Sequence, residues 1–143
     1  METILELTAH AVAANVPWIR RRVARAARRA GASLDIVQDM TLCAGEAVAN
    51  AARHAYGDGR GPVHVLVRRD EDVLTVVVRD DGKGLGDPRD ADSGGFGLRI
   101  IWRLAHDLQL VLPSSGGTEL RMGFPLADVA RRSSASGRRR ARA

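Results

Sequence analysis

Four polar side chains stand on an otherwise apolar segment, EAVANAARHAY, which covers residues 46–56. On a helix with 100° per residue, Asn50 falls roughly 40° and Arg53 roughly 20° from Glu46, and His54 lies at the edge of their stripe. The stripe adjoins a line of alanines, so we expect the polar groups to face a cleft at the edge of the core. A carboxylate held there costs free energy unless a ligand or metal compensates it. The segment therefore indicates a site, although a helix with a few solvated polar residues would have the same pattern.

Two glycine-rich segments follow this helix in the sequence and suit nucleotide binding. DDGKGLGD comes directly after a β-rich stretch, and GGFGL comes directly before a helical one. Glycines let the backbone pass close to a ligand, and the start of a helix offers unpaired N–H groups to phosphate. Either segment alone is also typical of plain turns, but their order behind the polar helix favours a site. The residues concerned, with a later Gly-Thr pair, are Asp80, Gly82, Gly84, Gly95, Gly97, Leu98, Gly117 and Thr118.

Hydrophobic periodicity predicts the elements that must position these residues. Helices are predicted over 12–30, 34–56 and 97–107, and strands over 3–8, 62–69, 73–80, 108–112 and 118–124. This order predicts an α+β fold, a two-layer α/β sandwich with helices on one face of a mainly antiparallel mixed sheet. Gly31 should end the first helix and Ser33 should cap the second. The second helix should bury one apolar line, made of Ile36, Met40, Cys43, Ala47 and Ala51.

Length and charge limit the organisation of the chain. A chain of 143 residues with 45% hydrophobic residues suits one domain, predicted over 1–127. Six of the 22 basic residues follow residue 128, and without them the net charge of +5 becomes −1. Residues 128–143 are arginine-rich, lack apolar periodicity and are predicted to be a disordered tail. With no apolar run of membrane-spanning length and no leader pattern, we expect the protein in the cytoplasm, and the single cysteine forms no intrachain disulfide.

Four segments together resemble the GHKL ATPase superfamily, and most closely its bacterial anti-sigma-factor serine/threonine kinases. They are EAVANAARHAY for the N box, RDDGKGLGD and GGFGLRII for the two glycine boxes, and GGTEL near the end. The likeness covers about residues 3–125. It implies the Bergerat fold of a histidine-kinase-like ATP-binding domain, in agreement with the predicted order of elements.

The resemblance also implies a role for each polar residue. Glu46 would be the general base that activates a protein hydroxyl, and Asn50 would bind Mg²⁺ through its amide oxygen. Arg53 would contact phosphate, and Asp80 would accept a hydrogen bond from the adenine amino group. Because GTP presents an acceptor at that place, an unmatched carboxylate should cost roughly 1–3 kcal/mol and favour ATP.

The remaining residues would form the nucleotide pocket and its lid. They are Gly82, Gly84, Gly95, Gly97, Leu98 and Thr118, with Thr118 supporting the Asp80 end. In one departure from the family, this chain has Phe96 where many of the serine kinases carry a basic residue, and Arg99 and Lys83 are the alternative cations. His54 recurs in the serine-kinase N box without an assigned chemistry.

The resemblance implies a kinase that uses ATP and Mg²⁺, binds a sigma factor, phosphorylates an anti-sigma antagonist and forms a homodimer. Three other functions stay open: a non-catalytic ATP-dependent partner-binding module, a detached catalytic domain of a histidine kinase, and a protein that binds nucleic acid through its arginine tail. No membrane partner is expected.

Overall fold

A single sheet organises the described part of the chain, residues 1–57, 59–83, 95–127 and 141–142 of the computed structural model. Its strand order is β1-β2-β3-β5-β4-β6. The first five strands pair antiparallel with their neighbours, and β6 pairs parallel with β4. The bounds are β1 Glu2–His10, β2 Pro62–Asp70, β3 Val73–Asp80, β4 Asp107–Val111, β5 Thr118–Pro125 and β6 Ala141–Arg142.

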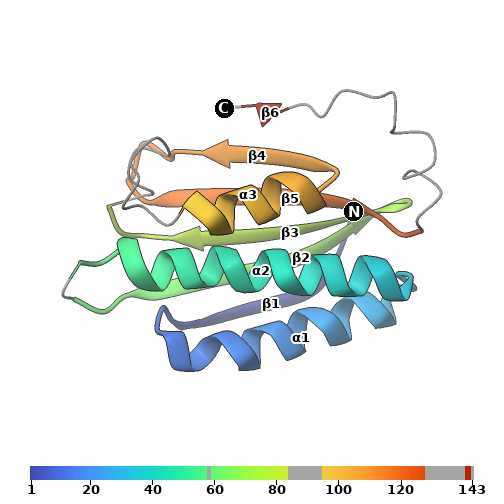
Figure 1. Ribbon diagram of the computed structural model, residues 1–143, viewed down its shortest axis with the longest axis horizontal. Coiled ribbons are helices and arrows are strands. Elements are labelled where there is room, and N and C mark those ends of the chain that lie inside the picture. The colour runs from blue at the N-terminus through green and yellow to red at the C-terminus, as the bar shows by residue number, and fades with distance from the viewer. Residues whose placement is uncertain (58, 84–94, 128–140, 143) are drawn as a thin grey trace.

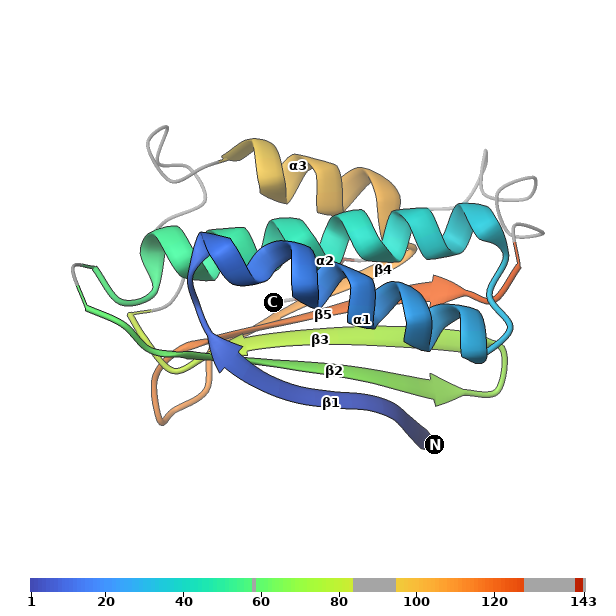
Figure 2. The same cartoon turned by 90° about the horizontal axis from the view of Figure 1, so that it is seen from below.

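Three α-helices cover one face of this sheet, as Figures 1 and 2 show. They are α1 Val16–Arg29, α2 Leu34–His54 and α3 Gly95–Leu104, and a 3-10 turn, η1 Ala13–Asn15, precedes α1. Within the described ranges no helix lies on the opposite face of the sheet, hereafter called the open face. The predicted fold, a two-layer sandwich with a mainly antiparallel mixed sheet, is confirmed.

The core lies between the helices and the inner face of the sheet. Val63, Val65 and Val67 alternate with more exposed residues along β2, as the period of a strand requires. All five residues of the predicted apolar line on α2 are buried: Ile36, Met40, Cys43, Ala47 and Ala51. Burial, with smaller contributions from the carboxylates of Asp39 and Glu46, raises the pKa of the Cys43 thiol to about 12. The thiol is therefore a neutral packing group.

The junction between α1 and α2 forms as predicted. Gly31 adopts a φ of 89°, a left-handed conformation that glycine tolerates at the end of a helix. The Ser33 hydroxyl then accepts a hydrogen bond from the Ile36 amide at 3.3 Å and caps α2. The two helices can therefore pack side by side and antiparallel across the same face of the sheet.

Several predicted boundaries were wrong by a few residues. The first helix begins at Val16 and not at residue 12, with Pro17 in its first turn, where a missing N–H costs nothing. The third helix covers Gly95–Leu104, because the chain already pairs with β5 from Asp107 onwards. None of the helices described here is long and apolar enough to span a bilayer.

The predicted tail lies mostly outside the described residues, which include only Ala141–Arg142 of it. Those two residues form β6 and pair with Leu108 and Gln109 of β4.

Candidate functional site

The polar stripe of α2 runs from the interior to the surface. Glu46 is half-buried, Asn50 is only 1% exposed, and Arg53 is exposed. The Arg53 Nε donates to the carbonyl of Ala49 at 3.4 Å, so this guanidinium folds back along its own helix. The three residues lie on one helix, as predicted, and the most deeply buried of them is Asn50.

The Asn50 carboxamide is buried without compensation. Neither its oxygen nor its nitrogen has a hydrogen-bond partner among the described residues, and the same holds for Nε2 of His54, one turn further along. A buried amide that makes no hydrogen bond costs about 1–3 kcal/mol, so native proteins rarely leave one unpaired. This position therefore suits a polar ligand that supplies the missing partner.

Asp80 ends β3 on the inner face of the sheet. It follows Val76 and Val78 at the spacing that keeps a side chain on one face, and it is 6% exposed. Its Oδ1 accepts a hydrogen bond from the backbone N–H of Gly82 at 3.0 Å. Its carboxyl also accepts one from the backbone of Thr118, the residue of β5 that pairs with Asp80. Burial outweighs these hydrogen bonds and raises the pKa of Asp80 above its ordinary value. A carboxyl held there is ready to accept a further donor.

Two glycines let three elements meet beside this carboxyl. A Cβ on Gly82 would lie 1.9 Å from the carbonyl oxygen of Ala55, and one on Gly117 would lie 2.1 Å from that of Asp80. The amide of Lys83 donates to the same Ala55 carbonyl at 2.7 Å. The end of α2, the turn after β3 and the start of β5 are therefore in backbone contact, which only glycine permits at these positions.

A matched pair of alanine variants tests this close approach. Gly116 and Gly117 both have positive φ, of 93° and 85°, but a Cβ on Gly116 would meet nothing within 4 Å. Both variants place an alanine at a similar positive φ, so the contact of the added Cβ should make Gly117→Ala lower the free energy of unfolding by about 1–3 kcal/mol more than Gly116→Ala. Urea unfolding of the two proteins measures the difference. Equal losses would show that the start of β5 does not need close contact with Asp80.

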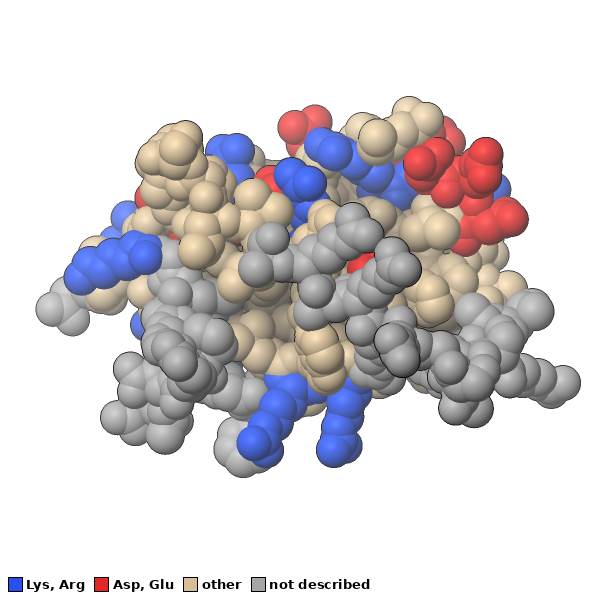
Figure 3. Space-filling view, turned by 90° about the horizontal axis from the view of Figure 1, so that it is seen from above, with Lys and Arg blue, Asp and Glu red and all other residues tan. Residues whose placement is uncertain are grey.

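The site elements converge at one end of the molecule, on the left in Figures 1 and 2. The C-terminal end of α2, the end of β3, the start of β5 and the N-terminus of α3 all lie there. Acidic side chains gather at the opposite end in Figure 3, where the β2–β3 turn carries the exposed Asp70, Glu71 and Asp72. That acidic charge is therefore far from an anion bound at the site.

Some predicted site residues are described only in part. Gly84 lies outside the described residues, and Gly95 and Gly97 are placed only as backbone in the first turn of α3. Leu98 is half-buried and packs against the core, and Thr118 is buried at the start of β5. The structure thus brings Asp80, Gly82 and Thr118 together.

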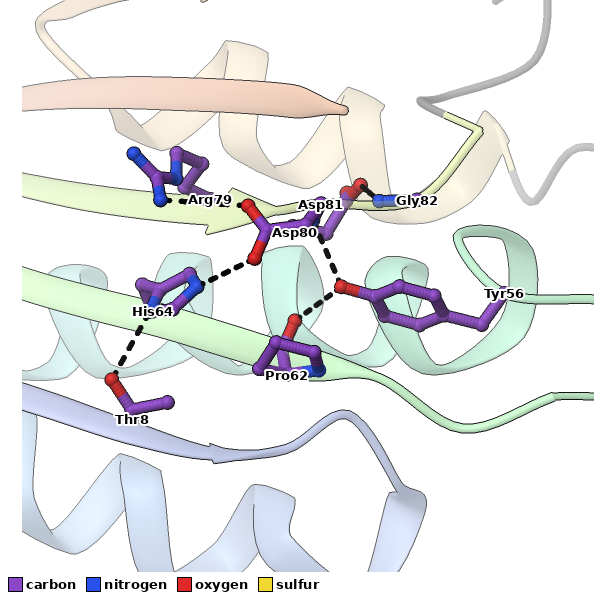
Figure 4. A network of polar contacts seen from close by, with 8 residues as sticks. All are labelled: Thr8, Tyr56, Pro62, His64, Arg79, Asp80, Asp81 and Gly82. Atoms are coloured by element: carbon purple, nitrogen blue, oxygen red, sulfur yellow. Dashed lines mark hydrogen bonds and ion pairs between the residues drawn. The ribbon is translucent and has the colours of Figure 1, made fainter. Parts of the chain in front are cut away.

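Three residues that hold the turn after β3 were not predicted from the sequence. They are Tyr56, His64 and Asp81, which Figure 4 shows as a connected network. Tyr56 stands at the end of the quoted N box but received no role, and His64 carries no motif. The only sequence feature that bears on His64 is the period of two in β2, which places this residue on the face of the sheet opposite the buried valines.

A helix with a buried amide that is unpaired among the described residues, packed over a sheet whose strand ends in an Asp-x-Gly turn, is the arrangement expected for the GHKL class of ATPases. The chain belongs to the histidine kinase-like ATPase domain family, whose sequence model matches residues 9–124. The predicted resemblance is confirmed, and with it ATP as the family's nucleotide.

Within this family, the chain is similar to several bacterial proteins named as serine-protein kinases. The chain is 31% identical over 134 residues to the serine-protein kinase RsbW of Staphylococcus aureus strain JH9, and this match covers 82% of the chain and 84% of the relative. The RsbW of strain Newman gives the same figures. A further S. aureus RsbW is 30% identical over 124 residues, which are 75% of this chain and 78% of the relative.

Proposed function

We propose that this protein is an ATP-dependent protein serine/threonine kinase of the anti-sigma-factor type. It binds a sigma factor and transfers the γ-phosphoryl group of ATP to a hydroxyl of an antagonist protein, and it acts as a homodimer in the cytoplasm. The family match and the similarity to RsbW support the class of reaction. Among the structural features, the unpaired buried carboxamide of Asn50 beside Glu46 carries the proposal.

The described residues fit magnesium-bound ATP. The Asn50 amide oxygen is a hard ligand of the kind that Mg²⁺ prefers, and it has no competing partner among the residues described. The Asp80 carboxyl accepts the adenine amino group, with Thr118 behind it and Gly82 giving the backbone its close approach. When bound, the metal nucleotide supplies an electrophilic phosphoryl group with part of its charge neutralised.

The other residues of the site take part in proton transfer, phosphate binding and enclosure of the nucleotide. Glu46 lies one helical turn before Asn50, about 6 Å along the axis, and takes the proton of the attacking serine or threonine hydroxyl. Arg53 is exposed at the end of the stripe and turns to phosphate. Gly84, Gly95, Gly97 and Leu98 complete the enclosure of the nucleotide. Arg99 and Lys83 are both exposed and supply positive charge in place of a basic residue at Phe96.

Replacing Asn50 tests the metal ligand without any assay of activity. Asn50→Leu removes both unpaired amide atoms and roughly keeps the shape of the side chain, so the nucleotide-free protein should unfold with unchanged or higher free energy. Its ATP affinity should fall about tenfold or more and lose its dependence on Mg²⁺. Calorimetry with and without Mg²⁺ and urea unfolding measure the two effects, with Gln38→Leu, an exposed carboxamide on the same helix, as control. A variant that is destabilised by several kcal/mol but keeps its Mg²⁺ dependence would assign Asn50 to the fold alone.

The proposed activity is tested with labelled ATP, Mg²⁺ and a candidate antagonist protein. The expected result is label on the antagonist that survives acid, because phosphate esters of serine and threonine are acid-stable. Acid-labile label would indicate a histidine kinase domain instead. ATP-dependent capture of the antagonist without any label would indicate a non-catalytic binding module.

A further inference from the structure

A polar network on the open face of the sheet ends at the turn that carries Asp80. Nε2 of His64 lies 2.9 Å from Oδ2 of Asp81, and Nδ1 of the same ring lies 3.0 Å from the Thr8 hydroxyl. The other carboxylate oxygen, Oδ1 of Asp81, pairs with the Arg79 guanidinium at 3.4 Å. Figure 4 shows these side chains joined across three strands. Both carboxylate oxygens of Asp81 are therefore held.

The strand register explains how the network forms. Thr8 pairs with His64 across β1 and β2, and His64 pairs with Arg79 across β2 and β3. The three side chains form one row on the open face, because directly opposed residues of neighbouring strands share a face. Asp81 lies two residues beyond Arg79 on that face, whereas Asp80 points to the inner face. The side chains of the adjacent residues Asp80 and Asp81 therefore lie on opposite faces of the sheet.

Tyr56 holds the same turn from the end of α2. Its hydroxyl accepts a hydrogen bond from the backbone amide of Asp81 at 2.8 Å and donates to the carbonyl of Pro62 at 2.5 Å. The ring packs against Gly61, where an added Cβ would lie 2.2 Å from it. Burial is the largest of several influences that raise the pKa of Tyr56, so the hydroxyl keeps the proton that it donates. The turn is fixed by its backbone on one side and by the Asp81 side chain on the other.

We propose that His64 and Tyr56 are positioning residues that set nucleotide selectivity, because they fix the Asp81 turn and thereby the direction of the Asp80 carboxyl. This inference rests on the proposed function, in which Asp80 reads the adenine amino group. A carboxyl gains full discrimination only when its angle to the donor is fixed, since hydrogen bonds weaken steeply when they bend. The contact of Arg79 with Asp81 is an exposed ion pair at 3.4 Å, whereas the imidazole and the aromatic hydroxyl make hydrogen bonds at 2.9 Å and 2.8 Å, so we expect His64 and Tyr56 to matter more than Arg79.

The change in selectivity distinguishes positioning from a merely structural role. Tyr56→Phe keeps the ring against Gly61 and removes both hydrogen bonds, and His64→Ala removes the shorter of the two contacts that hold the Asp81 carboxylate. Each variant should bind ATP roughly three- to tenfold more weakly than the wild type, with a smaller loss for GTP, so that the ATP/GTP affinity ratio falls at least about threefold. His64→Gln keeps an amide donor near Asp81 and should restore most of the ratio. His10→Ala, an exposed histidine at the end of β1, should leave it unchanged.

Calorimetric titration of each protein with ATP and with GTP in Mg²⁺, beside thermal unfolding without nucleotide, carries out the test. Loss of selectivity in variants that unfold at the wild-type temperature, with recovery in His64→Gln, is the expected result. Unchanged ATP/GTP ratios in Tyr56→Phe and His64→Ala, with normal ATP binding by the wild type, would overturn this inference and leave the proposed function standing. A wild-type protein that binds neither nucleotide would instead remove the proposed function itself.

Discussion

Glu46→Gln is expected to abolish phosphoryl transfer while ATP stays bound. The glutamine keeps the size of the side chain and its place on α2, but it cannot take the proton of an attacking hydroxyl. Loss of a general base lowers the rate about 10²- to 10⁴-fold. Single-turnover transfer of label to the antagonist measures the rate, and calorimetry measures the ATP affinity, which should change less than about threefold.

The position of Glu46 makes this variant a clean test. The carboxylate is half-buried one turn from Asn50, so the change should not disturb the core on the other side of α2. Glu6→Gln, on the exposed face of β1, is the matched control and should transfer normally. A Glu46→Gln protein that phosphorylates its partner at the wild-type rate would show that another group is the base.

Asp80→Asn should weaken nucleotide binding but leave the folded protein at least as stable as the wild type at neutral pH. The asparagine has one acceptor oxygen where the carboxylate has two, and it cannot serve both the backbone N–H groups and the adenine amino group, so ATP affinity should fall about tenfold to a hundredfold. Preference for ATP over GTP should largely disappear as well. Titration of wild type and variant with both nucleotides measures these losses. Equal ATP affinities for the two proteins would remove Asp80 from base recognition.

The pH dependence of folding gives a second readout on the same residue. Burial raises the pKa of Asp80 in the folded protein above the ordinary 3.8, so its folded state holds a proton more tightly than the unfolded state does. The stability that comes from this group is present below the ordinary pKa and is lost as the pH rises through the folded one. Asp80→Asn should therefore be as stable as the wild type or more stable at neutral pH. Urea unfolding from acidic to neutral pH should show a loss in the wild type that the variant lacks.

Local sequence patterns predicted most of the elements that position the site. The alternation of β2 and β3, the apolar line on α2 and the Gly31–Ser33 junction each reflect short-range physics, and all three are present. The start of α1 was placed too early, because the 3-10 turn before Pro17 has no distinctive periodicity.

The network behind the site could not be predicted in the same way. Tyr56 follows α2, His64 lies on β2 and Asp81 follows β3, and His64 meets Asp81 only because β2 and β3 adopt one particular register. Register depends on pairing between distant segments, which residue types alone do not reveal. The deep burial of the Asn50 amide likewise follows from how α2 lies on the sheet. The motif marked Asn50 as polar, but only the packing shows that its amide has no partner within the described residues.

Titration of the purified chain with ATP in the presence of Mg²⁺ shows whether the protein binds a metal nucleotide. We expect saturable uptake of one nucleotide per chain, weaker without the metal and weaker again for GTP. Heats indistinguishable from dilution for both nucleotides, from a protein that is demonstrably folded, would contradict it.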